Sequence, residues 1–239
     1  LSTFLFISPA SAQKSSMTAE QIIQRMAAQY ASAKTYQDVG IIQDIKSGGQ
    51  IEAVNSFKTY FVRPNKFRFE WESYSFRGDR EWNIVWGSGA NVFKDYWWGE
   101  VEKEENLSMA IAGATGVSRG AAHTIPTLLM KEVGGFRFTD LARISLLHEE
   151  KFENVACFVV RGYHPFGFPI DLWISKTDFL LRKSREKRED GRFEEEIRRN
   201  VKVNGPIPVS TFQYSPSKKT PKIKKTPKTD VLVGRFDRR

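Results

Sequence analysis

The residues best spaced for catalysis lie in Gly116-Val-Ser118-Arg-Gly120, which has the Gly-x-Ser-x-Gly spacing of a nucleophile elbow. Asp140 and His148 follow in the order of an acid and a base, so a serine hydrolase is one hypothesis for this chain. An elbow needs a strand that leads into a tight turn before a helix, whereas residues 110–115 are small and typical of a helix. We therefore interpret the motif as a flexible, glycine-rich link between two helices.

Other side chains that carry metal or redox chemistry are few. His123, His148 and His164 do not have the spacing of metal ligands, so the sequence predicts neither a metal site nor a cofactor. His164, which precedes Pro165, is expected to cap a loop. Cys157 is the only cysteine, which excludes an intrachain disulfide, and its apolar strand-like surroundings predict a small buried side chain.

The strongest pattern is a pair of successive strands, residues 55–63 and 66–74, joined at Arg63-Pro64-Asn65. Apolar and charged side chains alternate along the second strand, so one face is aromatic and the other polar. Such a sheet needs a cover for its apolar face, and the cover is either a packed core or a removable ligand. The aromatic side chains expected on this face are Phe57, Phe61, Phe67, Phe69, Trp71, Trp82 and Trp86.

The remaining elements follow from the spacing of apolar residues. A capping box at Thr18 predicts a helix of about four turns, and residues 107–133 predict two short helices separated by residues 116–122. The expected strands are residues 37–45, 55–63, 66–74, 80–86, 91–98, 155–163, 168–174, 179–188, 193–203 and 210–214. This order predicts an α+β, mainly β fold: an incomplete antiparallel β-barrel with helices closing its concave face.

The two ends of the 239-residue chain differ from its body. Residues 1–16 combine an apolar run with Ala10-Ser11-Ala12, the pattern that a signal peptidase cuts, and predict a signal-peptide remnant and leader cleaved after Ala12. No run approaches the about 20 apolar residues that cross a bilayer. We therefore expect an exported protein, periplasmic or secreted, with one domain over residues 17–214.

The net charge of +9 is concentrated at the C-terminal end. Residues 215–239 hold six Lys, three Arg and two Asp with few apolar side chains, which predicts a disordered basic tail. The simplest interpretation is a solubilising tail, and the alternative is transient contact with a membrane surface or an envelope protein. Because aromatic and charged residues segregate to opposite strand faces, no nucleic-acid partner is expected.

The segment Phe57-x-Thr-Tyr-Phe-Val-Arg-Pro-Asn-Lys-Phe-Arg-Phe-Glu70 resembles the signature region of bacterial LolA/LolB-like periplasmic proteins, which include the outer-membrane lipoprotein carriers. Residues 157–162, 171–183 and 207–212 resemble the same superfamily, and the resemblance covers about residues 18–214. It implies an incomplete barrel whose apolar cavity accepts acyl chains, with residues 107–130 as a lid over the cavity. It also implies that Arg63 is a latch, that is, a side chain that hydrogen-bonds the lid and favours the closed state. The chain departs from the carriers in its basic tail and its glycine-rich lid link.

Two functional hypotheses therefore stand beside the hydrolase. The first is an exported, non-enzymatic protein that holds a lipid or an acyl chain, for example that of a lipoprotein. The predicted binding residues are Arg63, Phe57, Phe61, Phe67, Phe69, Trp71, Trp82, Trp86, Leu128 and Leu129. The second is an envelope sensor or protein-interaction module with a filled core, which contacts its partner through the sheet edge or the tail. An apolar cavity of roughly 300 Å³ or more would favour the first hypothesis.

Overall fold

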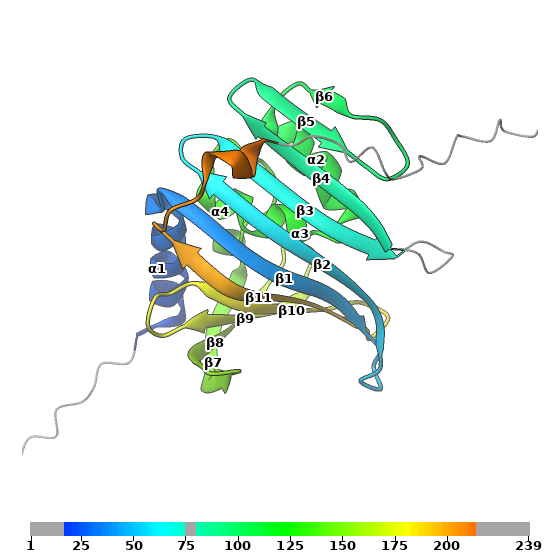
Figure 1. The fold of residues 1–239 in the computed structure, drawn as a ribbon. Helices are drawn as coiled ribbons and strands as arrows, with labels where there is room; N and C mark the ends of the chain where they lie inside the picture. Colours follow the sequence, from blue (N-terminus) through cyan, green and yellow to red (C-terminus); the bar gives the residue numbers. More distant parts are fainter. Residues whose placement is uncertain (1–16, 75–79, 214–239) are drawn as a thin grey trace, which may run out of the picture.

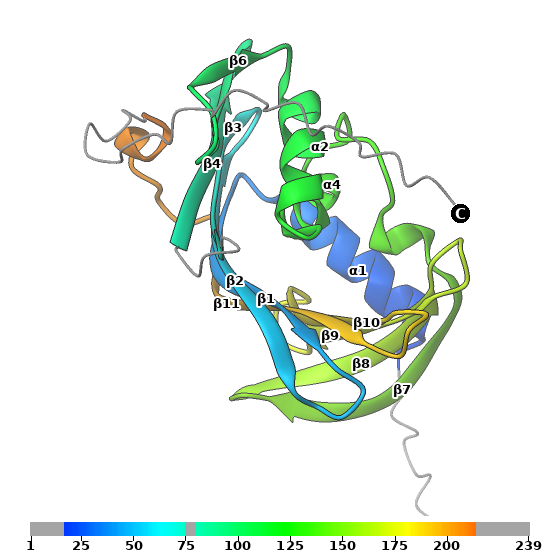
Figure 2. The same ribbon diagram turned by 90° about the vertical axis from the view of Figure 1, so that its right-hand side faces the viewer.

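A computed structural model describes residues 17–74 and 80–213. The predicted leader, residues 1–16, and the predicted tail, residues 215–239, lie outside this part of the chain. A single antiparallel sheet of 11 strands curves around a group of helices (Figures 1 and 2). Its strand order is β6-β5-β4-β3-β2-β1-β11-β10-β9-β8-β7, so β6 and β7 form two separate edges. The predicted incomplete barrel with helices on its concave face is confirmed.

The strands are β1 (Thr35–Ile45), β2 (Ile51–Val62), β3 (Lys66–Tyr74), β4 (Arg80–Ser88), β5 (Asn91–Asp95), β6 (Glu102–Glu104), β7 (Ala142–Phe152), β8 (Val155–Tyr163), β9 (Pro169–Ser175), β10 (Leu181–Lys187) and β11 (Phe193–Val203). The helices are α1 (Ala19–Ser32), α2 (Leu107–Val117), α3 (Ala121–Thr124) and α4 (Pro126–Leu129), with the 3₁₀ turns η1 (Phe138–Asp140) and η2 (Val209–Phe212). Strands β1 to β6 run outward to one edge, helices α2 to α4 cross the concave side, and strands β7 to β11 return from the other edge until β11 pairs with β1.

Helix α1 starts where the sequence predicts. The Thr18 hydroxyl accepts a hydrogen bond from the backbone N–H of Gln21, and the Gln21 side chain accepts one from the backbone N–H of Thr18. This reciprocal pair satisfies two of the free N–H groups at the helix start. The buried side chains of Ile22, Met26 and Tyr30 then follow at helical spacing and pack in the central core.

Four parts of the chain differ from the prediction. The segment 107–133 forms three helices, because α3 and α4 separate at Ile125. Residues 210–214 were expected to form a strand, but residues 209–212 form η2, which follows Pro208 and contacts β3 and β4; this prediction is wrong. Strands β6 and β7 were not predicted. β6 has only three residues, and in the edge strand β7 only Ile144 and Leu146 pack against the main core, so the apolar alternation of each strand is too short to predict it.

Gly40 lies in the middle of β1, where a side chain has no room. A Cβ atom at this position would lie 2.2 Å from the Phe57 ring and 2.5 Å from the carbonyl oxygen of Ile197. We expect Gly40→Ala to lower the free energy of unfolding by about 1 to 3 kcal/mol, because the overpacked interior must shift. Urea denaturation checks this, with Gly48→Ala as the control, since Gly48 has open space around it. Equal stability of the two variants would contradict the close approach.

Candidate functional site

Five of the predicted aromatic residues meet on the concave face of β2 and β3. The strand register pairs Phe57 with Trp71 and Phe61 with Phe67, and places Phe69 beside them on the same face. Each of the five side chains is at most 3% exposed, and the ring of Phe69 lies 5.8 Å from Phe57 and 5.4 Å from Trp71. They form one continuous core with the helices. In the described arrangement this interior is filled.

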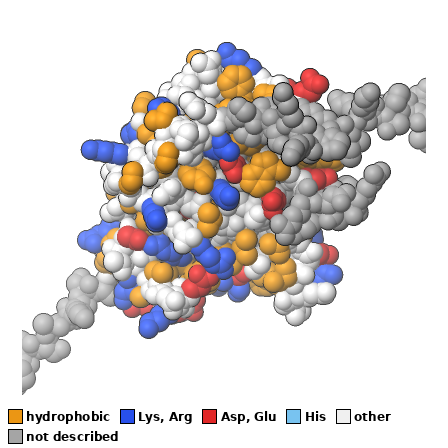
Figure 3. All heavy atoms as spheres, viewed as in Figure 1, with side chains coloured by type: hydrophobic (Ala, Val, Ile, Leu, Met, Phe, Trp, Pro, Cys, Tyr) orange, Lys and Arg blue, Asp and Glu red, His pale blue; other side chains and the backbone are white. Residues whose placement is uncertain are grey.

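Trp82 and Trp86 lie on the opposite, convex face, so their predicted place in the concave interior is wrong. The register sets Trp86 beside Arg68 and Trp82 beside Glu72, whereas Val85 is the residue that faces inward. In β4 the outward-facing Trp82, Ile84 and Trp86 are more apolar than the inward-facing Asn83 and Val85, so the alternation alone indicates the wrong face. Figure 3 shows hydrophobic side chains interspersed with Lys and Arg over the convex face.

Helices α2 to α4, here called the lid, cover the aromatic face with apolar side chains. The buried side chains of residues 107–133 include Leu107, Ala110, Ile111, Ala114, Ala121, Ala122, Ile125, Leu128, Leu129, Met130 and Val133. The predicted binding residues Leu128 and Leu129 are thus inside the core, on α4. Because the inner side of the lid is almost wholly apolar, moving it would expose a large hydrophobic surface on both the lid and the sheet.

Arg63 joins the end of β2 to the lid. Its Nε donates a hydrogen bond to the carbonyl oxygen of Ala33 at 3.0 Å, and its Nη2 donates to the carbonyl oxygens of Ala31 and Leu129, each at 2.9 Å. The guanidinium carbon also lies 5.3 Å from the centre of the Phe61 ring. A planar guanidinium with several donors suits such a junction of three carbonyl groups. One of the three contacts thus reaches α4 of the lid, and the other two reach the end of α1.

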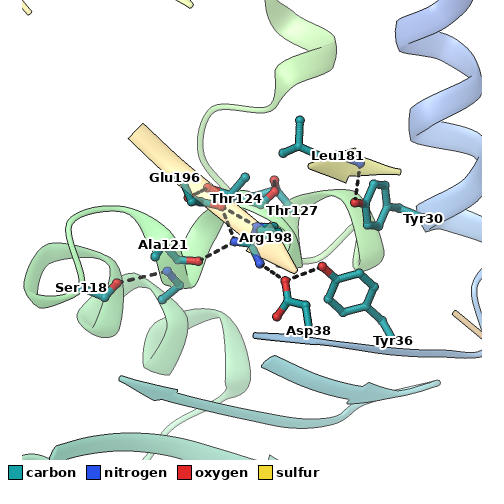
Figure 4. Close-up of polar contacts among 11 residues, drawn as sticks. Tyr30, Tyr36, Asp38, Ser118, Ala121, Thr124, Thr127, Leu181, Glu196 and Arg198 are labelled. Atoms are coloured by element: carbon teal, nitrogen blue, oxygen red, sulfur yellow. Dashed lines mark hydrogen bonds and ion pairs between the residues drawn. The ribbon is translucent and has the colours of Figure 1, made fainter. Parts of the chain in front are cut away.

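A second junction between sheet and lid is buried and ionic (Figure 4). Arg198 on β11 is fully buried, and its guanidinium forms ion pairs with Asp38 and Glu196. Its Nη2 donates to the carbonyl oxygen of Ala121 at 3.2 Å, and the Thr124 hydroxyl donates to Glu196 at 2.7 Å. Both of these contacts hold α3 against the sheet. None of these contacts was predicted from the sequence.

The protonation of the network follows from its burial. Burial opposes the charge of Arg198, but Glu196 and Asp38 together raise the pKa of the guanidinium well above its usual value. Burial raises the pKa of Glu196, although Arg198 acts in the opposite direction. The Tyr36 hydroxyl donates to Asp38 at 2.6 Å, and burial together with the Asp38 charge raises the pKa of Tyr36 well above its usual value. Arg198 therefore stays positively charged, and Tyr36 stays a neutral hydrogen-bond donor to Asp38.

A cavity of about 290 Å³ opens at the mouth of the concave side. Its polar wall includes Arg119, His123 and Glu196, so it reaches the buried network. Its apolar wall consists mainly of Phe136, Phe138, Phe166, Phe168 and Ile170. None of these was among the predicted binding residues. The signal for them was present, since Phe136 follows a Gly-Gly pair and Gly167 separates two phenylalanines in a turn.

The three residues of the hydrolase hypothesis have separate local partners. Ser118 is buried, and its hydroxyl accepts a hydrogen bond from the backbone N–H of Ala122 at 3.1 Å. Asp140 accepts from the backbone N–H of Arg137, and His148 lies on the edge strand β7 beside Glu150. Ser118 thus acts as a local cap at the link between α2 and α3.

We expect Ser118→Ala to cost about 1 kcal/mol of stability, because one backbone N–H loses its acceptor. Thermal unfolding measures this cost. Hydrolysis of p-nitrophenyl acyl esters, assayed on the same samples, should be equal in the variant and the natural protein. Loss of a hydrolytic activity on this substitution alone would revive the hydrolase hypothesis.

Other predicted side chains have the expected local roles. The His164 ring accepts a hydrogen bond from the backbone N–H of Phe166 at 3.2 Å, as expected for a loop cap. Cys157 is buried beside Val159 and Trp173 on the convex face, and burial raises the pKa of its thiol. Among residues 17–74 and 80–213, no helix is long and apolar enough to cross a membrane.

Comparisons with known proteins show a likeness of fold only. No protein-family model matches the sequence, and no match was found among curated proteins. The MucA/MucB complex structure of Pseudomonas aeruginosa matches 82% of this chain and 61% of that chain, with 12% identity and a TM-score of 0.47. LprF from Mycobacterium bovis matches 80% and 95%, with 11% identity and a TM-score of 0.47. A LolA superfamily protein from Nitrosomonas europaea matches 83% and 99%, with 10% identity and a TM-score of 0.35. The LolA-like fold expected from the sequence is thus found among the matches, and the likeness says nothing of a ligand.

Proposed function

We propose that the protein is an exported, non-enzymatic binding protein whose concave interior accepts the acyl chain of a lipid or lipoprotein when the lid leaves the sheet. The observation that carries this proposal is the Arg63 junction, in which one side chain joins β2 to the carbonyl oxygen of Leu129 at the end of α4. Beneath that junction both the lid and the sheet present apolar side chains. The described arrangement is the closed state of such a protein.

The energetics restrict what can open the lid. Each Å² of apolar surface exposed to water costs about 25 cal/mol, so an empty open state is unfavourable in proportion to the surface that the lid uncovers. An acyl chain replaces this burial, whereas a polar ligand does not. The ligand therefore shifts the equilibrium only because it binds the open state better than the closed one.

A second candidate is a protein-interaction module whose filled core never opens. The observation that favours it is the Arg198 network, in which the buried ion pairs lie within the sheet, between β11 and β1 and along β11. Two hydrogen bonds to these charged groups, from Arg198 to the Ala121 carbonyl oxygen and from the Thr124 hydroxyl to Glu196, hold α3 on the sheet. Opening would break both of these hydrogen bonds, and a hydrogen bond to a charged group is worth about 1.5 to 3 kcal/mol. In this alternative the Arg63 junction only strengthens the core.

Native mass spectrometry of the protein purified from an exported fraction tests the proposal. A co-purifying lipid or acylated peptide, identified after organic extraction, would support it. A palmitoylated peptide and the same peptide without its acyl chain are then added to the apo protein, and only the first should bind. A mass that stays at the apo value with both peptides would favour the interaction module.

The same assay distinguishes the two faces of the sheet. Phe61→Leu changes an interior side chain, and Trp82→Leu changes one that is 38% exposed on the convex face. We expect the first substitution to change the affinity for the palmitoylated peptide and the second to leave it unchanged. Equal affinities for all three proteins would argue against binding in the concave interior.

A further inference from the structure

The loop between β5 and β6 exposes an aromatic surface, here called the Trp97–Val101 surface. Trp97, Trp98 and Val101 are 37–43% exposed, although large apolar side chains elsewhere in the sheet are mostly buried. The two indole rings are nearly perpendicular with centres 5.6 Å apart, and the Trp98 ring lies 4.9 Å from the ring of Tyr96. Tyr96 is buried in the main core and so anchors the exposed pair. Exposed tryptophans held in a fixed arrangement are typical of a binding surface.

Several carboxylates follow these two tryptophans in the chain. Glu100, Glu102, Glu104 and Glu105 flank Val101, and two lysines stand against these four carboxylates: Lys94, which pairs with Glu102 and Glu104, and the exposed Lys103. Glu100 and Glu105 are exposed and form no ion pair within residues 17–74 and 80–213. The surface therefore offers aromatic faces together with negative charge that its own cations do not neutralise. A basic segment that also contains prolines complements both the negative charge and the aromatic faces.

We propose that the C-terminal segment, residues 214–239, docks on the Trp97–Val101 surface. The segment contains six Lys and three Arg against two Asp, and the run Lys-Lys-Thr-Pro-Lys occurs twice, at residues 218–222 and 224–228. Prolines in extended segments pack on aromatic side chains, and lysines pair with carboxylates or lie over indole rings. The surface is a poor match for an anionic membrane, because its net charge is of the same sign.

The place where the segment starts brings it within reach. Arg68 on β3 donates hydrogen bonds to the carbonyl oxygens of Thr211 and Gln213, and η2 contacts β3 and β4. Figure 1 shows η2 lying across these strands, and β5 is the next strand beyond β4. The two strand spacings from β3 to β5 amount to about 10 Å, whereas 26 extended residues span up to about 90 Å. A tether this short gives a local concentration on the order of millimolar, so weak contacts are enough.

Carbodiimide cross-linking of the full chain tests the docking, since this reagent joins only carboxylates and amines that touch. We expect monomers in which Glu100 or Glu105 is linked to lysines of residues 218–228, at least fivefold more often than the exposed Glu132 and Glu189 are. Replacing both Trp97 and Trp98 with Ser should remove this preference, and Trp82→Ser is the matched control that should keep it. Links spread evenly over the exposed glutamates, or no links in the monomer, would overturn the proposal.

A second measurement does not depend on changing the tryptophans. In the variant that carries both Glu100→Gln and Glu105→Gln, trypsin should cleave within residues 214–239 several-fold faster than in the natural chain. Raising the salt concentration should accelerate cleavage of the natural chain toward the same rate. If trypsin cleaves both proteins at the same rate, the docking is overturned. This holds whether or not the tail is found to bind anionic vesicles.

Discussion

Replacing Arg63 with Leu is expected to release the lid without unfolding the sheet. The substitution removes three charge-assisted hydrogen bonds to carbonyl groups of Ala31, Ala33 and Leu129, while the leucine still covers Phe61. We expect lid opening to become easier by about 2 kcal/mol, or about 30-fold, since only the Leu129 contact and part of the others are lost on opening. Hydrogen exchange in residues 126–130 measures this opening, and the palmitoylated peptide should bind and leave faster.

Arg137 provides the matched control. Its guanidinium also donates to three carbonyl oxygens, those of Thr127, Lys131 and Val133, but all three belong to α4 and the turn after it. Arg137→Leu should therefore raise exchange locally and leave the attachment of α4 to β2 intact. Peptide retention that is unchanged in the Arg63 variant, or equally changed in the Arg137 variant, would rule out the latch.

Patterns within a few residues could be predicted from the sequence. The capping box of α1 depends on Thr18 and Gln21 alone, and the alternation of β3 depends on side chains two residues apart. Both are consequences of backbone geometry, which is the same whatever surrounds the element. The alternation along β3 is the reason that Phe67, Phe69 and Trp71 share one face of the sheet.

The features that depend on distant segments could not be predicted. Trp86 belongs to the more apolar face of β4, yet this face points outward, where the Trp86 ring stacks on Phe93 of the neighbouring β5 at 5.5 Å. The alternation of Glu196 and Arg198 in β11 is what a solvated strand face also shows. Only the pairing of β11 with β1, about 160 residues earlier, brings Asp38 beside Arg198 and encloses both under α3.

Replacing Arg198 with Met is expected to have the largest effect on stability. Removing the cation leaves Asp38 and Glu196 buried without a charge partner, which costs about 3 to 5 kcal/mol. Arg199 is the matched control, since it is the next residue of β11 and pairs on the surface with the half-exposed Glu153. Arg199→Met should cost less than about 1 kcal/mol. Urea unfolding of both variants at one pH compares them directly.

The loss of stability in Arg198→Met should also depend on pH. The direction of this dependence shows whether an unpartnered buried carboxylate causes the loss. Burial already raises the pKa of Glu196, and loss of Arg198 removes the charge that opposes this rise. Between the usual carboxyl pKa and the raised pKa, Glu196 keeps its proton in the folded variant but has lost it in the unfolded chain. The free energy of unfolding of the variant therefore falls as the pH rises through this interval. The deficit relative to the natural protein should be larger at pH 8 than at pH 5. A deficit that is the same at both pH values would mean that lost packing, and not an unpartnered carboxylate, is what the variant suffers.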